Sequence, residues 1–371
     1  MPESTPKQRI AVLFGGPSAE YDVSCSTAAN IVQNLDRSQF EVTPIRVTRQ
    51  AVWVVGKDDP NYPVVDVAAL LAMTPDPGER SGPATLATRQ TRASALAAGI
   101  EALQQVDVVI PALHGPYGED GTVQALLDLI GVPYVGCGVA ASLAGMDKVW
   151  TKILLTAAGL SVADGVVLTG EDDEPGDLIG EADRARLGLP VFVKPAREGS
   201  SIGVSKVEDW ALLADAVALA RRSDRKVLVE PQIRGREIDI AVLEYPDGRL
   251  VCGPPMEIRV ETGIFDYAAK YQTGDSLYFP TDLDPQVTEH LHEVARTVFR
   301  TLGCAGLLRV DFFLCQDDAG GPAQLIVNEV NTFPGCTPKS QYPRIWQQAG
   351  LEFAEVLTVL VDTATAARRS A

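Results

Sequence analysis

The sequence predicts an α/β fold in the N-terminal part of the chain and an α+β arrangement in the C-terminal part. Near the N-terminus, apolar strand patterns alternate with helix patterns, which is typical of an open parallel sheet. Near the C-terminus, two apolar segments at residues 306–314 and 324–335 flank a cluster of turn residues, which indicates an antiparallel hairpin. With 371 residues and 46% hydrophobic side chains, the chain is long enough for two or three domains.

The first predicted domain spans residues 1–140 and opens with the strand RIAVLFGG, a small-residue turn and a helix pattern. Two more apolar strands follow at residues 40–47 and 106–113. The second of these ends at the HGPYGEDG segment, residues 114–121. Ligands of open α/β sheets bind at the carboxyl ends of strands, so this segment is a candidate binding region. Residues 56–100 are rich in Pro, Asp and Ala, and we expect a surface insertion there.

The second predicted domain spans residues 141–235. Asp147 is placed to cap a helix over residues 148–158, and the strand LPVFVKP then leads into the loop AREGSSIGVSKV. The strand KVLVE ends at Glu230, where Pro231 interrupts the ladder and marks a hinge into the next domain.

The third predicted domain spans residues 236–371. It contains a helix pattern that begins at Asp284-Pro285 and is closed by Gly303, which suits the left-handed position after a helix. The hairpin follows, and helices complete the chain.

The C-terminal hairpin carries the most informative side chains. If its turn is centred near Gly320, Arg309 lies opposite Asn331 and Asp311 opposite Glu329 on one face. The same register makes three apolar pairs: Phe313–Val327, Val310–Val330 and Leu314–Ile326. Two facing carboxylates repel unless a cation lies between them, and hard oxygen ligands suit Mg²⁺ that bridges nucleotide phosphates. The alternative is a solvated hairpin in which Arg309 neutralises both acids.

A second candidate site is the Gly/Ser loop at residues 196–203, which has Lys194 at its base. Loops of this composition let backbone amides approach phosphate oxygens closely. The loop is not a Walker A motif, because GxxxxGK[ST] is absent. A plain hairpin turn is the alternative. Lys148, at the start of its helix, is a weaker candidate for the same chemistry.

The composition excludes several classes of function. Asp and Glu outnumber Lys and Arg by 49 to 32, and this net charge of -17 argues against binding nucleic acid or an anionic membrane. No apolar stretch approaches the ~20 residues that span a bilayer, and the first residues lack the pattern of a signal peptide. The six cysteines are scattered without metal-ligand spacing, as expected for reduced thiols. We therefore expect a cytoplasmic protein.

Taken together, these motifs resemble the ATP-grasp superfamily and, more narrowly, the D-alanine–D-alanine ligase family. The resemblance covers almost the whole chain, and the matching segments occur in the family order: GGPSAEYDVS, HGPYGEDG, GMDK, KPAREGSSIGV, FDYAAKY, RVDFF and NEVNTFPG. It implies a three-domain ATP-grasp architecture in which two sheets clamp ATP. It also implies that ATP and two D-alanine molecules yield D-alanyl-D-alanine through D-alanyl phosphate, for peptidoglycan synthesis, in a homodimer formed through the N-terminal domain.

The resemblance further implies a role for each matching position. The implied ATP ligands are Lys148 and Lys194 for the phosphates, Glu230 and the Ile233 backbone for the adenine, and Glu237 for the ribose. The implied ligands of two Mg²⁺ (or Mn²⁺) ions are Asp311, Glu329 and Asn331. The residues implied around the first D-alanine are Glu20, Ser200, Tyr271 and His114, with Arg309 and the Gly335 amide as the oxyanion site. The residues implied for the carboxylate of the second D-alanine are Lys270 and Ser340.

An acyl phosphate hydrolyses in water, so the reaction needs a cover over the site. Residues 263–280, with their glycines and aromatic side chains, are expected to form this lid. Relatives that make D-alanyl-D-lactate often carry phenylalanine in place of the lid tyrosine. Tyr271 therefore favours an amine as the second substrate.

The last motif departs from the family pattern in the region of the second substrate. Pro338 and Gln341 differ from the usual residues, and Lys339 adds a cation that points either at the substrate carboxylate or at solvent. A ligase that joins D-alanine to another D-amino or D-hydroxy acid, such as D-serine or D-lactate, is therefore the alternative activity. A nucleotide-binding regulatory protein on an inactive ligase fold is the alternative outside enzymes.

Overall fold

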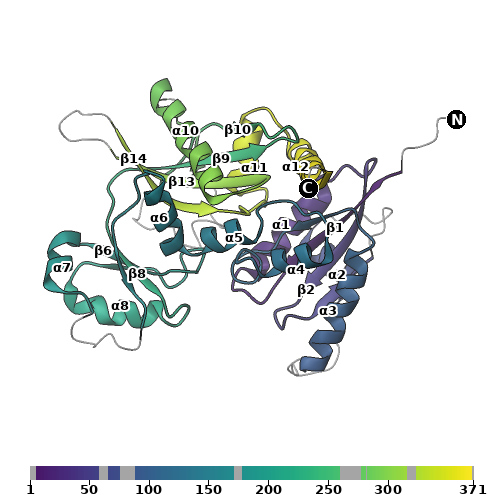
Figure 1. Ribbon diagram of the computed structural model, residues 1–371, viewed down its shortest axis with the longest axis horizontal. Helices are drawn as coiled ribbons and strands as arrows, with labels where there is room; N and C mark the ends of the chain where they lie inside the picture. The colour runs from purple at the N-terminus through teal and green to yellow at the C-terminus, as the bar shows by residue number, and fades with distance from the viewer. Residues whose placement is uncertain are drawn as a thin grey trace.

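The computed structural model describes residues 6–57, 66–75, 88–170, 178–259, 277–280, 282–315 and 323–369 of the chain. Within these ranges the strands form three sheets, which occupy three regions of the molecule in Figure 1. The first sheet has a parallel centre and the other two are antiparallel. The predicted change from an α/β to an α+β arrangement is confirmed.

The N-terminal sheet has the strand order β3-β2-β1-β4. Its strands are β1 (Gln8–Gly15), β2 (Phe40–Val47), β3 (Trp53–Val55) and β4 (Val108–Pro111). β1 is parallel to both β2 and β4, as the alternating pattern predicts, and β3 is antiparallel to β2. Helix α1 (Tyr21–Asn34) follows β1, α3 (Arg89–Leu103) precedes β4, and α4 (Thr122–Ile130) follows the loop after β4.

The expectation of a surface insertion at residues 56–100 is met only in part by the described residues of that range: most side chains at residues 89–98 are exposed, whereas parts of α2 and α3 pack on the N-terminal sheet. Helix α2 (Val67–Met73) buries Leu70 completely, and α3 ends with the fully buried Leu103. Gly99 of α3 packs so closely on Trp53 that an added Cβ would lie 2.5 Å from the ring. The contact escapes a pattern search because α3 offers a glycine, and not a large apolar side chain, to the indole.

The central sheet has the order β5-β8-β6-β7, with every neighbouring pair antiparallel. Its strands are β5 (Val166–Leu168), β6 (Val191–Pro195), β7 (Ser205–Val207) and β8 (Val227–Pro231). Its helices are α7 (Glu181–Leu187), the 3₁₀ turn η1 (Trp210–Leu212) and α8 (Leu213–Ala220). One face of the sheet and α8 share a small apolar core around Val193 and Val229.

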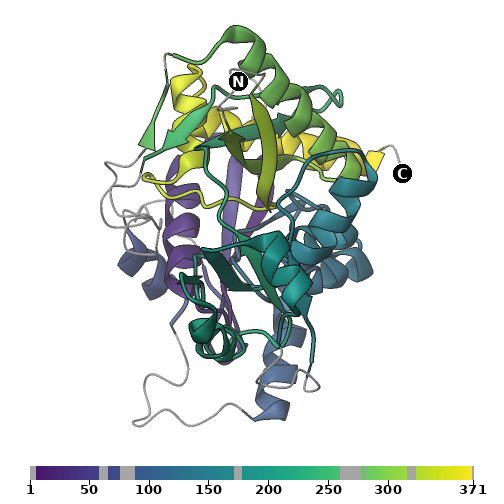
Figure 2. The same ribbon diagram turned by 90° about the vertical axis from the view of Figure 1, so that its left-hand side faces the viewer.

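The C-terminal sheet is the largest, with the order β12-β11-β9-β13-β14 and β10 paired with β9. Its strands are β9 (Arg236–Glu244), β10 (Leu250–Cys252), β11 (Met256–Ile258), β12 (Leu277–Tyr278), β13 (Leu307–Cys315) and β14 (Gln324–Asn331). The helices of this part are α10 (Pro285–Leu302), α11 (Gln341–Gln348) and α12 (Phe353–Arg369). Figure 2 shows α10 on the outer side of this sheet, with the central sheet in front and the N-terminal sheet behind.

The predicted caps of α10 are present. Asp284 accepts a hydrogen bond from the backbone N–H of Gln286 at 2.7 Å, and Gly303 ends the helix in a left-handed conformation with φ 67°. None of the helices in the described ranges combines the length and apolar character needed to cross a membrane.

The predicted register of the hairpin holds for residues 309–311 and fails after Asp311. Arg309 pairs with Asn331, Val310 with Val330 and Asp311 with Glu329, as predicted. A β-bulge between Asp311 and Phe312 then shifts the pairing by one residue, because β14 contributes the extra Asn328. The predicted pairs Phe313–Val327 and Leu314–Ile326 are therefore wrong. The observed pairs are Phe312–Val327, Phe313–Ile326 and Leu314–Leu325.

Two helices connect the N-terminal sheet to the rest of the chain, namely α5 (Val139–Met146) and α6 (Lys148–Ala157). Helix α6 and most of α5 fall in the predicted second domain, yet Ala144 and Leu155 belong to the apolar core of the C-terminal sheet. The domain boundaries at residues 140 and 235 therefore remain predictions. The packing shows that α6 is attached to the C-terminal sheet.

This packing generates a test of stability. Leu155 is fully buried on α6, whereas its neighbour Leu154 is 36% exposed. We expect Leu155→Ala to lower the free energy of unfolding by about 2–5 kcal/mol, because it leaves a cavity in the core. Leu154→Ala, the matched control on the same helix, should cost less than about 1 kcal/mol. Urea unfolding followed by circular dichroism measures both, and equal costs would contradict the assignment of α6 to this core.

Candidate active site

Two adjoining cavities lie where the N-terminal, central and C-terminal parts of the chain meet. Predicted site residues that line the first are Glu20, His114, Ser200, Asn331, Gly335 and Ser340. Predicted site residues that line the second are Lys194, Glu230, Ile233, Glu237 and Asp311. Lys148, Arg309 and Glu329 line both cavities. The structure thus brings the predicted residues together, except Lys270, Tyr271 and most of the predicted lid, which lie outside the described residues.

A row of three acids crosses the C-terminal sheet at the floor of the second cavity. Asp239 on β9 lies opposite Asp311 on β13, which lies opposite Glu329 on β14. Like charges in this arrangement repel, and Arg309 offsets the repulsion. Its Nε lies 2.7 Å from Oδ1 of Asp311 and 3.6 Å from Oδ2 of Asp239, and its Nη2 lies 2.8 Å from Oδ2 of Asp311.

Arg309 therefore does neutralise Asp311, as the alternative interpretation of the hairpin supposes, but the hairpin is not solvated there. The Arg309 residue is only 8% exposed. Burial disfavours the guanidinium charge, yet Asp311 and Asp239 raise the pKa of Arg309 well above its ordinary range. A permanently charged, buried arginine at the border of two cavities can stabilise negative charge that develops between them.

Glu329 on β14 forms an ion pair with Lys148, which lies at the start of helix α6. Asp147 fixes the start of α6 by accepting hydrogen bonds from the backbone N–H groups of Val149 and Trp150. Lys148 Nζ then lies 2.7 Å from Glu329 Oε1 and donates to the backbone carbonyl of Glu198 at 2.7 Å. Burial disfavours the ammonium form, but Glu329 raises the pKa of Lys148.

The donor set of the hairpin fits a hard divalent cation. Asp311 and Glu329 face each other, and Asn331 donates through Nδ2 to Oδ2 of Asp311 at 3.1 Å. No cluster of three or more His, Cys, Asp or Glu side chains in the described ranges could hold a metal ion. A cation bound between the two carboxylates would take the amide oxygen of Asn331 as a third donor, and oxygen donors of this kind suit Mg²⁺.

The Gly/Ser loop between β6 and β7 closes onto the start of α1. Ser200 and Ser201 both adopt left-handed conformations, with φ of 51° and 58°. The Ser200 hydroxyl donates to the Glu20 carboxylate, and a Cβ added at Gly199 would lie 2.8 Å from Glu20 Oε2. The loop is therefore more than a plain hairpin turn, because its backbone conformation and its glycine serve a contact with the start of α1 in the N-terminal part of the chain.

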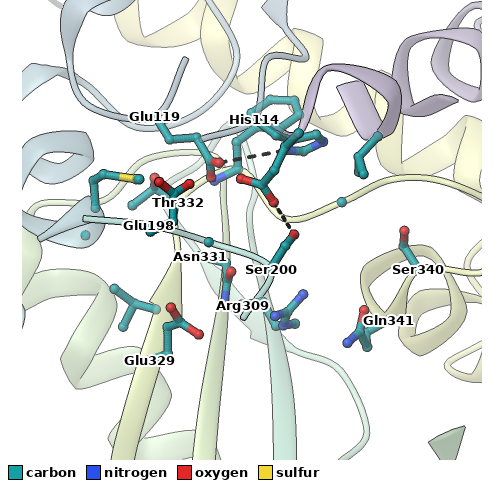
Figure 3. Close-up of a pocket in the computed structure, with 18 of the residues that line it drawn as sticks. His114, Glu119, Glu198, Ser200, Arg309, Glu329, Asn331, Thr332, Ser340 and Gln341 are labelled. Carbon is teal, nitrogen blue, oxygen red and sulfur yellow. Dashed lines mark hydrogen bonds and ion pairs between the residues drawn. The ribbon is translucent and has the colours of Figure 1, made fainter. Parts of the chain in front are cut away.

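His114 lies buried beside Glu119 above the first cavity, as Figure 3 shows. Its Nε2 is 2.9 Å from Thr27 Oγ1, and its Nδ1 is 3.8 Å from Glu119 Oε2. Burial lowers the pKa of His114, but Glu119 and, more weakly, Glu20 outweigh burial and leave the pKa raised. The imidazole is thus poised to carry a positive charge near the first cavity.

Comparison with known proteins agrees with this geometry. The profile described as D-ala D-ala ligase N-terminus matches residues 9–137, and the one described as D-ala D-ala ligase C-terminus matches residues 154–362. The chain belongs to the D-alanine–D-alanine ligase family. A protein of Mycobacterium sp. (strain KMS) named D-alanine--D-alanine ligase is 47% identical over 378 residues, which cover 97% of each chain.

Two solved structures show the same relationship. The D-alanine-D-alanine ligase from Coxiella burnetii has a TM-score of 0.78 at 30% identity and covers 99% of this chain and 96% of its own. The VanG D-Ala:D-Ser ligase from Enterococcus faecalis has a TM-score of 0.76 at 32% identity and covers 97% of this chain and 100% of its own. The three-sheet arrangement is therefore the ATP-grasp architecture of the D-alanine–D-alanine ligase family.

Of the three departures from the family pattern, Pro338, Lys339 and Gln341, only Gln341 lines the two cavities. Ser340 is buried, and its Oγ lies 2.7 Å from Thr337 Oγ1. Gln341 lines both cavities, and Figure 3 shows it beside Ser340. Lys339 is exposed and lines neither of the two cavities. Of the two expected directions for Lys339, the structure shows the one toward solvent.

Sequence reasoning missed several polar residues of this ligase site. Asp239 is a lone acid between the apolar Ile238 and Ile240 of β9, a signal that could have identified it. Lys152 follows Lys148 by one helical turn, so the two lysines project from the same face of α6. Glu119 falls within the HGPYGEDG segment, but nothing in the sequence indicates its contact with His114.

The environment of His114 generates a prediction about its titration. The chain has three histidines, so side-chain NMR signals can be followed individually. We expect His114 to titrate above its ordinary pKa and Glu119→Gln to lower that pKa, because the variant removes the nearest carboxylate. His292, whose pKa burial lowers, is the internal control and should not change.

The sign of the accompanying change in stability follows from the same shift. A raised pKa in the folded state favours the imidazolium form, so this contribution to stability is present at acidic pH and is lost as the pH rises through the folded-state pKa. An unchanged His114 titration in Glu119→Gln would show that the carboxylate does not act on the ring.

Proposed function

We propose that the protein is an ATP-dependent ligase that joins two D-alanine molecules into D-alanyl-D-alanine, releasing ADP and phosphate, for peptidoglycan synthesis. The observation that carries the proposal is the pair of adjoining cavities with Arg309, Lys148 and Glu329 on their shared border. The first cavity is lined mainly by charged and polar side chains, which suit the ionised groups of amino acids, and the second lies between two sheets with lysines at its edge. A phosphoryl group can pass between two ligands only where their sites meet in this way.

The proposed chemistry explains the charges at the border. A carboxylate is a poor electrophile, so the first D-alanine attacks the γ-phosphate of ATP and becomes an acyl phosphate. Lys148 and Lys194 would hold the phosphates, and Arg309 with the Gly335 amide would stabilise the negative charge on the oxygen of the attacked carbonyl. The amine of the second D-alanine then displaces phosphate. Mg²⁺ or Mn²⁺, held by Asp311, Glu329 and Asn331, would offset phosphate charge when bound.

The remaining roles are those that the family resemblance implies, and the positions of the residues in the two cavities support them. Around the first D-alanine, Glu20 would bind the ammonium group, with its carboxylate oriented by Ser200, and His114 would lie near the reacting groups. Ser340 would bind the carboxylate of the second D-alanine. The proposal also includes Lys270, Tyr271 and a lid at residues 263–280. Their roles rest on the family resemblance alone.

In the second cavity the adenine would contact Glu230 and the Ile233 backbone, and the ribose would contact Glu237. Glu230 is deeply buried and forms ion pairs with two lysines. A carboxylate held in this way keeps free lone pairs for the exocyclic amine of an adenine.

We also propose that the protein acts as a cytoplasmic homodimer without nucleic acid or membrane partners. The free cysteines suit a reducing compartment, and the net charge of -17 disfavours polyanionic partners. Large exposed apolar side chains occur on three consecutive helices: Leu129 on α4, Leu143 on α5, and Trp150, Ile153 and Leu154 on α6. Exposed apolar groups of this kind mark interaction sites. Leu129, which is 85% exposed, lies in the predicted N-terminal domain.

D-Serine is the second candidate for the acceptor, and Gln341 is the observation in its favour. This side chain lines both cavities, and within the described part of the chain its amide makes no hydrogen bond. A free amide beside the acceptor position can bind a hydroxyl group that D-alanine lacks.

Product identification tests the proposed reaction. With ATP, Mg²⁺ and D-alanine alone, we expect D-alanyl-D-alanine and one ADP per dipeptide, measured by mass spectrometry and a coupled ADP assay. With equal D-alanine and D-serine, we expect the homodipeptide to predominate. Absence of any dipeptide from D-alanine alone sinks the proposal, and a predominance of D-alanyl-D-serine establishes the second candidate instead.

Replacing Arg309 tests the site itself. We expect Arg309→Met to lower kcat by about a hundredfold or more, because the developing oxyanion loses its buried cation. Binding of ATP, measured by calorimetry, should change little, since the phosphates keep both lysines. Arg300→Met, at an exposed position on α10, is the matched control and should retain full activity. Normal turnover in a folded Arg309→Met variant would remove Arg309 from the mechanism.

A further inference from the structure

The buried Glu230 on β8 has two cations where one would neutralise it. Its Oε1 lies 2.5 Å from Lys152 Nζ, and its Oε2 contacts Lys194 Nζ. Only 4% of the Glu230 side chain is exposed, and the two lysine side chains are 12% and 14% exposed. Burial raises the pKa of Glu230, but the two lysines outweigh burial and leave the pKa below its ordinary value.

The two lysines differ in what else they can reach. Lys194 lies at the end of β6 and lines the second cavity, as Glu230 does. Lys152 is not among the residues that line that cavity, and its Nζ also donates to the carbonyl of Ala163 at 3.2 Å. Lys194 can therefore turn toward a ligand in the cavity, whereas Lys152 stays behind Glu230.

A ligand with a phosphate chain would change the balance around Glu230. If Lys194 moves to the phosphates, a buried carboxylate loses one partner, and a buried charge without a partner is costly. Lys152 removes this cost, because Glu230 keeps one ammonium group after Lys194 has left. Burial and, in addition, repulsion by the neighbouring ammonium group of Lys194 lower the pKa of Lys152. The departure of Lys194 would relieve this repulsion.

We infer that Lys152 is a positioning residue for nucleotide binding: it acts as the permanent counter-ion of Glu230 and so releases Lys194 to the phosphates. Lys152 touches no part of the nucleotide itself. The inference rests on the proposed function, because it takes the second cavity as the ATP site.

Nucleotides of different charge separate this role from a structural one. Adenosine has no phosphates, so Lys194 can stay with Glu230 when adenosine binds. ATP requires Lys194 to leave. We expect Lys152→Met to weaken ATP binding on the order of tenfold to a hundredfold. Adenosine binding should change by less than about threefold.

Calorimetric titration of the full-length protein with Mg²⁺-ATP, ADP and adenosine provides the measurement. Lys152→Arg should restore most of the ATP affinity, because it restores the charge. Lys152→Gln keeps a hydrogen-bond donor without the charge, so it should show the same ATP-selective loss and serves if the Met variant does not fold. Lys206→Met, on β7 with an exposed partner in Glu208, is the control and should bind all three ligands normally.

Kinetics add a second readout, since the KM for ATP should rise in Lys152→Gln while kcat at saturating ATP changes little. Equal losses for ATP and adenosine would overturn the inference, because they would show that Lys152 only shapes the adenine pocket. Unchanged ATP affinity in both neutral variants would overturn it too. If the unmodified protein binds neither ATP nor ADP, the proposed function fails first and the inference fails with it.

Discussion

A group of largely buried ion pairs around the two cavities, one of which connects helix α6 to the central sheet, is the constraint on which the rest of the site depends. Lys148 on α6 pairs with Glu329 on β14, and Glu230 on β8 pairs with lysines from β6 and α6. Burial makes each of these charges costly without its partner. The elements that surround the two cavities are therefore held in positions where Glu329 and Glu230 each meet a cation, and a ligand that carries phosphates would replace some of these contacts.

Nucleotide binding at such a site is an exchange of partners. The cations proposed to hold phosphates, Lys148 and Lys194, already hold the protein's own acids, Glu329 and Glu230. A ligand must bring enough negative charge to draw the lysines away, and each acid must then find another cation. A bound divalent ion would serve Glu329, whereas Lys152 already serves Glu230. Through this exchange the site would bind a polyanion accompanied by a metal ion, whereas a neutral nucleoside would leave the ion pairs in place.

How far the sequence predicts this site depends on whether a contact is local. The pairing of Asp311 with Glu329 follows from alternation across a short hairpin, and the structure has it. The bulge at Asn328 does not follow, because one extra residue in a strand leaves the apolar pattern almost unchanged. The packing of Gly99 on Trp53 and the contact between Lys152 and Glu230 were also missed. Both depend on tertiary positions that spacing within one element does not encode.

Helix α6 shows why such non-local contacts matter for the ligase site. Its apolar side is fixed to the C-terminal sheet through Leu155, while its first turn is tied to the central sheet. The backbone N–H of Lys148 donates to the carbonyl of Ala196 at 3.0 Å, and Asp147 contacts Lys226. A movement of the central sheet relative to α6 would therefore change the distance from Lys152 to Glu230. Because that ion pair governs whether Lys194 is free, the relative position of the sheets also governs whether Lys194 is available to bind phosphates.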